Sequence, residues 1–424
     1  MRIAIVGAGI TGIRAAQILE QAGENPTLFE ARSYLGGRTK TANPKDQVKY
    51  EAGGEWLDSD HCRTIAWIES LGLKLQPRTP LKDKFIHKGQ STTTPWQDCE
   101  ESEQAVEQAA KQICRTLRKP AWKNEDKKDL DAQTVDDFIR SHATSGRGHA
   151  WVTAKYRSDE GEDLTKVGLL GWLAGFTHYV DRAQDVASAY RVQGGLSEAV
   201  HKAANTLAAR PVLNAPLRRV EQSPGKVRLS FEGHEAEFDR VIITLPPRAI
   251  SQVDFNHQLD HQICLAQQSV GAARAIKIAW QFRSKWWEAE GWSGGMFCDG
   301  PVQQTWDAGL DQAPVLTAYV CGEAALHWLA QKDPVQSALA ALEIDFPAAK
   351  DEFVQGWLHD WVTDPFSQGA FSYFPPGYVL GPMRHAAQPQ SRLHFAGEHT
   401  AEWSGFIEGA LESAERAAAE VMNA

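Results

Sequence analysis

The fold is decided by the first stretch of the chain, IAIVGAGITG at residues 3–12. The β-branched start of this stretch indicates a short buried strand, and the apolar spacing after it indicates a helix. Gly7, Gly9 and Gly12 form a G-x-G-x-x-G pattern. In this pattern the first glycine permits a tight turn, the second lets backbone approach a pyrophosphate, and the third lets helix and strand pack. A second strand that ends at Glu30 completes a β-α-β unit and predicts a dinucleotide site.

The acidic residue at the end of the second strand limits which dinucleotide can bind. Glu30 can accept hydrogen bonds from a ribose 2′-hydroxyl, whereas it would repel the 2′-phosphate of NADP. NAD and FAD share the glycine pattern, so the glycines that follow matter. Gly36 and Gly37 precede Arg38, which can place a cation near a pyrophosphate. The segment 51–56 contains a further glycine pair, where backbone can pass close to a flat ligand.

Composition places the chain among ordinary globular proteins and excludes several partners. Its 424 residues are enough for two or three domains. The net charge of −10 argues against a nucleic-acid partner, which usually needs a basic face. The chain has no run of about 18 apolar residues, so we expect no membrane span and a soluble protein. The six cysteines form no C-x-x-C pair, which favours reduced thiols and a cytoplasmic location.

Strand-type segments at the start, middle and end of the chain are separated by helical and mixed segments. The expected elements are helices over 99–119, 165–180 and 405–421 and buried strands over 241–245, 274–282, 315–320 and 393–396. We predict an α/β fold, α+β overall, in which a Rossmann-type domain is interleaved with a domain of mixed sheet plus helices. The first domain is assigned residues 1–80, 190–260 and 388–424, and the second residues 81–189 and 261–387.

Taken together, several motifs resemble the flavin amine oxidase family, and most closely its monoamine oxidase branch. The similarity begins with the glycine-rich segments described above and is strongest near the end of the chain. The matching segments are 6–12, 30–39, 53–56, 191–196, 241–247, 373–377, 395–398 and 403–410. Residues 80–190 match poorly. The resemblance implies FAD as cofactor, so the two predicted domains become an FAD-binding domain and a substrate-binding domain.

The resemblance also implies roles for individual residues around FAD. Glu30 would hold the adenosine ribose, and Arg32 and Arg38 would lie near the pyrophosphate. The backbone at Leu217 would lie near the adenine, and Glu398 against the ribityl-phosphate region. The complete set of predicted cofactor-binding residues is Gly7, Gly9, Gly12, Glu30, Arg32, Gly37, Arg38, Gly53, Gly54, Trp56, Leu217, Trp361, Gly397, Glu398 and Ile407.

The flavin end of the cofactor is the part that matters for chemistry. By resemblance, Gly53, Gly54 and Trp56 would border the flavin, and Trp361 would lie near it. Ile407 stands where the last predicted helix begins, and helix N-termini carry partial positive charge and free N–H groups. Reduced flavin is anionic at its N1–C2=O edge, so an N–H of Ile407 aimed there would favour the reduced state. The alternative is a helix that only packs.

Three residues are candidates for catalysis. Lys277 lies in an apolar strand, where a lysine usually points to solvent. In the family that it resembles, the matching lysine holds a water at flavin N5 and is linked to reoxidation by oxygen. Phe371 and Phe406 match the two rings that stand before the flavin, where monoamine oxidases have tyrosines. The missing hydroxyls make this aromatic cage more apolar, and packing in the core is the alternative for both rings.

The resemblance predicts an FAD-dependent amine oxidase. A hydride would pass from the carbon beside the nitrogen of a small amine to flavin N5, with oxygen as acceptor and imine or aldehyde and hydrogen peroxide as products. Ala370 stands where covalently flavinylated members have cysteine, so FAD is expected to bind non-covalently. The alternatives are an L-amino-acid oxidase or flavin desaturase of the same fold, and a non-catalytic FAD-binding protein. An amino acid would need a cation for its carboxylate; the sequence identifies none, although the poorly matched segment 80–190 could supply one.

Two other patterns point to no chemistry. Residues 291–295 fit the G-x-S-x-G pattern of hydrolases, which requires a strand before it and a helix after it. Residues 286–290 are charged and not strand-like, and residues 296–298 indicate a strand after the pattern. His257 and His261 have the spacing of one helix face and could bind a metal, but their polar flanks favour an exposed helix. We therefore expect no metal site.

Overall fold

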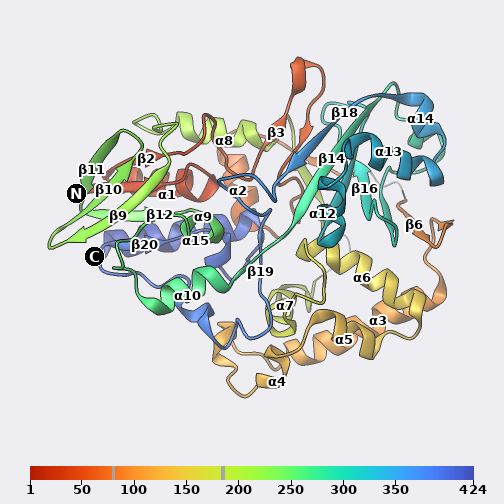
Figure 1. Cartoon of the computed structure of the whole chain (residues 1–424), viewed down its shortest axis with the longest axis horizontal. Helices are drawn as coiled ribbons and strands as arrows, with labels where there is room; N and C mark the ends of the chain where they lie inside the picture. Colours follow the sequence, from red (N-terminus) through yellow and green to blue (C-terminus); the bar gives the residue numbers. More distant parts are fainter. Residues whose placement is uncertain (79–81, 183–186) are drawn as a thin grey trace.

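The computed structural model of the chain describes residues 1–78, 82–182 and 187–424. One part of the molecule is built on a parallel sheet in the strand order β2 (Asn25–Phe29), β1 (Arg2–Val6), β12 (Arg240–Ile243) and β20 (Leu393–Phe395). These strands come from the start, the middle and the end of the chain, and both termini lie beside them (Figure 1). The predicted Rossmann-type α/β fold is confirmed, whereas the boundaries of the two domains stay a prediction.

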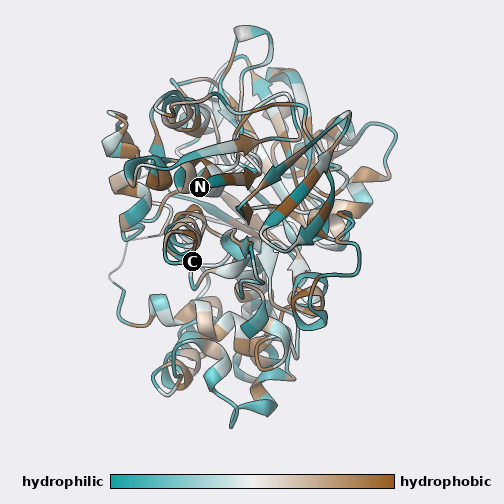
Figure 2. Cartoon of the chain, turned by 90° about the vertical axis from the view of Figure 1, so that its left-hand side faces the viewer, coloured by the Kyte–Doolittle hydropathy of each residue, from teal (hydrophilic) through white to brown (hydrophobic). Residues whose placement is uncertain are grey.

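The alternation of side chains along β1 explains how the two faces of this sheet are covered. Ile3 and Ile5 face a core shared with helices α1 (Ile10–Gln21), α2 (Cys62–Ser70), α8 (Leu196–Asn205) and α15 (Ile407–Met422). Ala4 and Val6 face the opposite core, which contains the antiparallel strands β9 (Leu217–Ser223), β10 (Lys226–Phe231) and β11 (His234–Phe238). Hydrophilic and hydrophobic residues alternate along β10 (Figure 2), as expected for a strand with one buried face.

A larger, mixed sheet forms the second part of the molecule. Its order is β18 (Phe353–Asp360), β14 (Ala275–Phe282), β17 (Val315–Cys321), β16 (Gln304–Asp307), β15 (Met296–Cys298), β6 (Lys84–His87) and β7 (Gln90–Thr92). All pairs are antiparallel except β15 with β6. Strand β14 lies between β18 and β17, and its burial is nearly continuous. Helices α11 (Trp286–Ala289), α12 (Glu323–Leu329), α13 (Pro334–Asp345) and α14 (Ala348–Glu352) belong to this part.

A group of helices lies below the two sheets in Figure 1. It consists of α3 (Gln97–Cys114), α4 (Lys128–Asp131), α5 (Val135–His142), α6 (Gly146–Glu160) and α7 (Leu169–Phe176). Helix α5 begins with a reciprocal capping box between Thr134 and Asp137. The remaining short elements are α9 (Pro247–Ile250), α10 (His261–Ser269) and strands β3 (Thr41–Ala42), β4 (Tyr50–Glu51), β5 (Leu75–Pro77), β8 (Tyr190–Val192), β13 (Gly271–Ala272) and β19 (Ser372–Tyr373).

Most predicted elements are present, and one was wrong. His257 does not share a helix with His261, because helix α10 begins at His261 and the side chain of Asp260 caps it. His257 instead has a φ of 56°. The segment around Ser293 has a helix before it and strand β15 after it, so it lacks the setting that a hydrolase nucleophile requires. The predicted helices over 99–119 and 165–180 are shorter, at α3 and α7.

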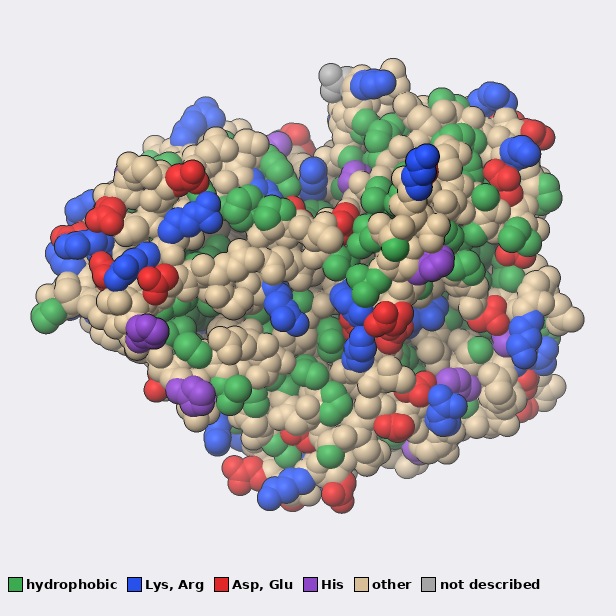
Figure 3. Space-filling model, in the orientation of Figure 1, with side chains coloured by type: hydrophobic (Ala, Val, Ile, Leu, Met, Phe, Trp, Pro, Cys, Tyr) green, Lys and Arg blue, Asp and Glu red, His purple; other side chains and the backbone are tan. Residues whose placement is uncertain are grey.

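On the face drawn in Figure 3, acidic and basic side chains are interspersed over the whole outline. Among the helices of the described residues, none combines the length and apolar character needed to cross a bilayer.

The packing of α1 on β1 generates a prediction. A Cβ at Gly12 would lie 1.9 Å from the carbonyl oxygen of Gly7, so Gly12→Ala forces the helix away from the strand. We expect it to lower the free energy of unfolding by about 1–3 kcal/mol. Gly146→Ala is the control, because a Cβ there meets no described atom within 4 Å. Urea denaturation measures both, and equal stability of the two variants would show that this contact does not matter.

Candidate functional site

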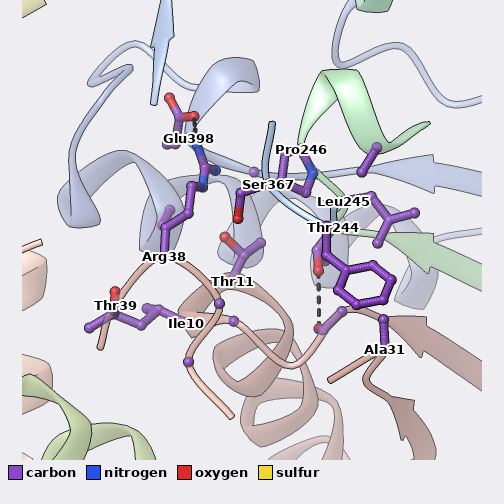
Figure 4. Close-up of a pocket in the computed structure, with 18 of the residues that line it drawn as sticks. Ile10, Thr11, Ala31, Arg38, Thr39, Thr244, Leu245, Pro246, Ser367 and Glu398 are labelled. Atoms are coloured by element: carbon purple, nitrogen blue, oxygen red, sulfur yellow. Dashed lines mark hydrogen bonds and ion pairs between the residues drawn. The ribbon is translucent and has the colours of Figure 1, made fainter. Parts of the chain in front are cut away.

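A cavity runs along the carboxyl ends of the parallel strands, and the predicted cofactor residues surround it. It is lined by the turn after β1, the segments after β2 and β12, and the loop before α15. Of the predicted cofactor-binding residues, all but Gly12 and Trp56 line it. Thr11, Arg38, Ser367 and Glu398 lie around it in Figure 4. This is the place where open parallel sheets bind ligands.

Each of the three glycines of the fingerprint has the role that its position in the pattern predicts. Gly7 has a φ of 105°, and a Cβ there would lie 2.5 Å from Oγ1 of Thr244, so Gly7 makes the turn. Gly12 supports packing and does not line the cavity. Gly9 lines the cavity, and the nearest atom to a Cβ there is 3.8 Å away. The backbone at Gly9 is therefore open to a ligand at the uncapped start of helix α1, where free N–H groups favour an anion.

Glu30 is held in place by backbone donors. Its buried carboxylate accepts hydrogen bonds from the N–H groups of Ala8 at 2.9 Å and Arg32 at 2.8 Å. Each carboxylate oxygen has a second lone pair, so Glu30 keeps acceptor capacity in the cavity that it lines. These are the acceptors that a ribose diol needs, and they fit the adenosine end of a dinucleotide.

The two predicted pyrophosphate arginines differ in their partners. Arg32 lines the cavity, but its guanidinium pairs with Asp364 and donates to Oγ of Ser367 at 2.8 Å. Arg38 donates to Oε1 of Glu398 at 2.8 Å and points toward it in Figure 4. Each arginine is thus already neutralised by a carboxylate, so neither presents a free charge toward a phosphate.

Glu398 lines the first cavity and connects several groups in its wall. Besides Arg38, it accepts hydrogen bonds from Oγ of Ser372 at 2.9 Å and from the N–H of Gly405 at 2.8 Å. Burial alone would raise the pKa of this carboxyl, but Arg38, His399 and the Gly405 N–H outweigh burial and lower it. Glu398 is therefore ionised at neutral pH and joins Arg38 to the loop that leads into helix α15.

A second, larger cavity of about 1090 Å³ adjoins the first. Helices α3, α6 and α7 and the strands of the large sheet surround it. The residues that line both cavities are Gly53, Gly54, Lys277, Tyr319, Phe371, Gly405 and Phe406. All three predicted catalytic residues are in this shared set. Trp56 lines only the second cavity, where the guanidinium groups of Arg191 and Arg78 lie over its ring. Its contact with a flavin stays a prediction.

Lys277 is buried and does not point to solvent. Its ammonium donates to the carbonyl oxygens of Glu51 at 3.0 Å and Gly53 at 2.9 Å and to Oε2 of Glu55 at 2.9 Å. The same ammonium lies 5.0 Å from the centroid of the Trp306 ring, whose N–H also donates to Glu55. All three protons of Lys277 thus have acceptors within the protein, and the buried charge is paired.

Phe371 and Phe406 are fixed by different neighbours. Phe406 makes edge contacts with His61 and Trp403, at centroid distances of 5.1 Å and 6.1 Å. Phe371 packs against Gly161, where a Cβ would lie 2.6 Å from Cζ of the ring. Both rings line the shared wall of the two cavities, as an aromatic cage would. Their function as a cage stays a prediction.

The described residues contain one group with the spacing of metal ligands, formed by Asp58, Asp60 and His61. Arg182 already bonds both carboxylates, donating to Asp58 at 2.7 Å and to Asp60 at 2.9 Å. A guanidinium therefore supplies the positive charge that this acidic group requires.

The fold and the two joined cavities define a class: a protein that binds a dinucleotide on a Rossmann-type sheet and a second small molecule beside it. The family model for flavin containing amine oxidoreductase matches residues 10–422. The chain therefore belongs to the flavin-containing amine oxidoreductase family and is a flavin-dependent oxidoreductase of the amine oxidase class, which confirms the resemblance found in the sequence.

Individual relatives are distant but cover nearly the whole chain. Flavin-containing amine oxidase A of Sus scrofa is 23% identical over 460 residues, covering 100% of this chain and 85% of the relative. An L-amino-acid oxidase of Siganus canaliculatus is 27% identical over 458 residues, covering 99% of this chain and 85% of the relative.

Solved structures agree in fold. Wild-type putrescine oxidase bound to putrescine matches with a TM-score of 0.90 at 23% identity, covering all of both chains. Cyclohexylamine oxidase from Brevibacterium oxydans IH-35A matches with a TM-score of 0.90 at 22% identity, covering 100% of this chain and 98% of that chain. At this level of identity the likeness shows the fold and leaves the substrate open.

The sequence analysis missed four residues at the site: Glu55, Asp159, Glu160 and Tyr319. Glu55 follows directly after the glycine pair that was predicted to border the flavin, so its position in the sequence could have identified it as a site residue. Asp159 and Glu160 precede Gly161 in a segment that resembles the family poorly. Tyr319 looked like one more residue of a buried strand. Only the tertiary structure brings these residues to the second cavity.

The Arg38–Glu398 pair generates a pH prediction. The pKa of Glu398 is lowered from 4.5, so its stabilising contribution is complete above pH 4.5 and is lost as pH falls through the lowered value. Glu398→Gln should therefore lower the free energy of unfolding by about 1–3 kcal/mol at pH 7. The loss should become smaller as the pH falls below 4.5, the ordinary pKa of a free glutamate carboxyl.

Urea denaturation at pH 7 and at acidic pH measures this difference. Glu237→Gln, which removes the exposed partner of Arg228, is the control and should leave stability unchanged. A loss for Glu398→Gln that is the same at every pH would contradict the assignment of an ionised carboxylate.

Proposed function

We propose that this protein is an FAD-dependent amine oxidase that oxidises a small amine at the carbon beside its nitrogen. The observation that carries the proposal is the junction of the two cavities. One cavity has the fingerprint of a dinucleotide site, and the other is lined by aromatic and acidic side chains. They share the wall that holds Lys277, Phe371 and Phe406, so a cofactor and a substrate would meet there.

The residues of the first cavity fit FAD. Glu30 would bind the ribose, and the free N–H groups at the start of α1 would receive the pyrophosphate across the open backbone of Gly9. At the other end, helix α15 begins at Ile407 without a side-chain cap, so its N–H groups are available to the flavin. Trp361 donates to the carbonyl of Ala52 at 2.8 Å and fixes the wall between them.

Bound FAD supplies the redox chemistry, in which a hydride leaves the substrate carbon, the imine hydrolyses to aldehyde or ketone, and oxygen takes up the electrons as hydrogen peroxide. The chain itself positions the reactants and excludes water. Phe371 and Phe406 make the approach apolar, which favours the uncharged amine at the reacting carbon. Lys277 keeps a buried positive charge at the shared wall, where it stabilises negative charge developing on oxygen.

Two observations support non-covalent binding of FAD. Ala370 lines the first cavity and has no atom that could form a thioether. Among the residues that the structure describes, none of the six cysteines lines either cavity.

The charges of the second cavity favour an amine over an amino acid. Its basic lining residues are Arg78, Lys84, Lys111, Lys155, Arg182 and Lys277. Each of them has a carboxylate partner within 4 Å among the described residues. The undescribed residues 79–81 and 183–186 contain no Lys or Arg. No cation of this cavity is thus left for the carboxylate of an amino acid.

The visible spectrum of the purified protein, before and after anaerobic mixing with amines and amino acids, tests the proposal. We expect a yellow protein that releases its flavin on denaturation and is bleached by at least one amine. Bleaching by amino acids alone would replace the proposal with an amino-acid oxidase. A protein that binds no FAD, or flavin that no substrate reduces, would overturn it.

Lys277→Met tests the proposed role of the buried cation. The variant should keep its flavin, while reoxidation by oxygen slows by about 100-fold or more, because the charge at the shared wall is lost. Mixing the reduced enzyme with oxygenated buffer in a stopped-flow instrument measures this rate. Lys111→Met is the matched control, since Lys111 lines the same cavity and pairs with Glu107. Reoxidation at the wild-type rate would remove Lys277 from the mechanism.

A further inference from the structure

Two carboxylates at the end of helix α6 face the second cavity without partners. Asp159 and Glu160 are the last residues of this helix, and both line the cavity. Neither side chain makes a hydrogen bond or an ion pair with any residue that the structure describes. Glu103 of the same lining differs, since it accepts from Lys155 and Trp151, whereas Glu100 is exposed at the start of helix α3. Asp159 and Glu160 therefore hold acceptor capacity that the protein itself does not use.

The end of α6 is packed directly against the predicted reaction site. Gly161 follows Glu160 with a φ of 65°, and a Cβ there would lie 2.6 Å from Cζ of Phe371 and 3.1 Å from Oη of Tyr319. Both of these side chains line the wall that the two cavities share. The two carboxylates are thus one and two residues away from a backbone position that touches the aromatic cage.

The surroundings strengthen the negative potential at this place. Helix C-termini carry partial negative charge from unsatisfied carbonyl groups, and Asp159 and Glu160 add to it when they are ionised. Lys155 and Arg182 act on Asp159 from a distance, but each is bonded to another carboxylate. Burial raises the pKa of Asp159 to about 7 and, together with Asp159, the pKa of Glu160 to about 8. Such carboxyls release their protons when a cation comes near.

A second observation at this site comes from Tyr319. Its hydroxyl oxygen is buried and has no hydrogen-bond partner among the described residues. Buried hydroxyls are normally paired, so this orphan group requires a partner that the chain does not provide. Because Tyr319 lines both cavities, a bound substrate is the partner that its position fits.

We propose that the substrate is a diamine or polyamine whose second ammonium group binds to Asp159 and Glu160, with the hydroxyl of Tyr319 as a further partner. The first amine would then lie at the shared wall between Phe371 and Phe406, uncharged, while the second stays charged at the end of helix α6. This inference rests on the proposed amine oxidase function and adds the substrate class to it.

The test compares diamines with monoamines of the same length. Anaerobic reduction of the FAD-loaded enzyme is followed against concentration for putrescine and n-butylamine and for cadaverine and n-pentylamine, giving an apparent Kd and a limiting rate for each. Wild type should bind the diamines about 10- to 100-fold more tightly, the range expected for hydrogen bonds to a charged group. The double variant Asp159→Asn, Glu160→Gln should lose this preference and keep its limiting rate with n-pentylamine.

Glu100→Gln is the matched control, because Glu100 lines the same cavity from the first turn of helix α3. It should keep the wild-type preference. The single variants Asp159→Asn and Glu160→Gln repeat the test if the double variant does not retain flavin. A wild type without preference for diamines, or a double variant that keeps it, would overturn the inference.

If no amine reduces the flavin, the proposed function fails, and calorimetry then decides the inference on its own. Cadaverine that binds wild type but not the double variant would support a diammonium site. Equal binding to both proteins, or none to either, would overturn it.

Discussion

The structure of the site depends on the burial of one ammonium group. Lys277 reaches from strand β14 of the large sheet to the end of strand β4 and the segment after it, where Glu51, Gly53 and Glu55 supply its three acceptors. An ammonium without partners at this depth would cost several kcal/mol, so the strand and the segment are held at a fixed separation. The glycine pair at Gly53 and Gly54 forms part of both cavity walls and takes its position from this contact.

The same ion pair joins the two parts of the molecule. Glu55 also accepts from the indole N–H of Trp306 on β16 and pairs with Arg191 of β8 at 3.3 Å. The carboxylate of Glu55 thereby connects strands β8, β14 and β16 to the edge of the dinucleotide cavity. Each of its partners in these strands is more than a hundred residues away in the sequence. The carboxylate of Glu55 thus has two cationic partners and an indole donor, so its buried polar atoms are compensated within the protein.

The sequence predicted those features that are local in the chain. The roles of Gly7, Gly9 and Gly12 follow from a strand, a turn and a helix within ten residues, and the structure has each glycine in the predicted setting. Lys277 shows the limit of local reasoning, because strand alternation alone favours solvent, and only its partner Glu55, over two hundred residues away, makes burial possible.

The second cavity could not be predicted, because long-range packing creates it. No local pattern singles out Asp159 and Glu160 in the sequence, and their importance comes from the contact of Gly161 with Phe371. His257 was misassigned for a local reason: the cap at Asp260 starts its helix later than the spacing of the histidines predicted.

The two cavities share a wall but differ in electrostatic character, and this difference determines which ligand each one suits. Helices α1 and α15 both begin at the first cavity, so their N-termini make it suited to an anionic dinucleotide. Helix α6 ends at the second cavity with two acidic residues, so its C-terminus makes that cavity suited to a cation. The orientation of each helix therefore favours an anion in the first cavity and a cation in the second, independently of side-chain contacts. Lys277 lies at the boundary between the two cavities, where it is paired with Glu55.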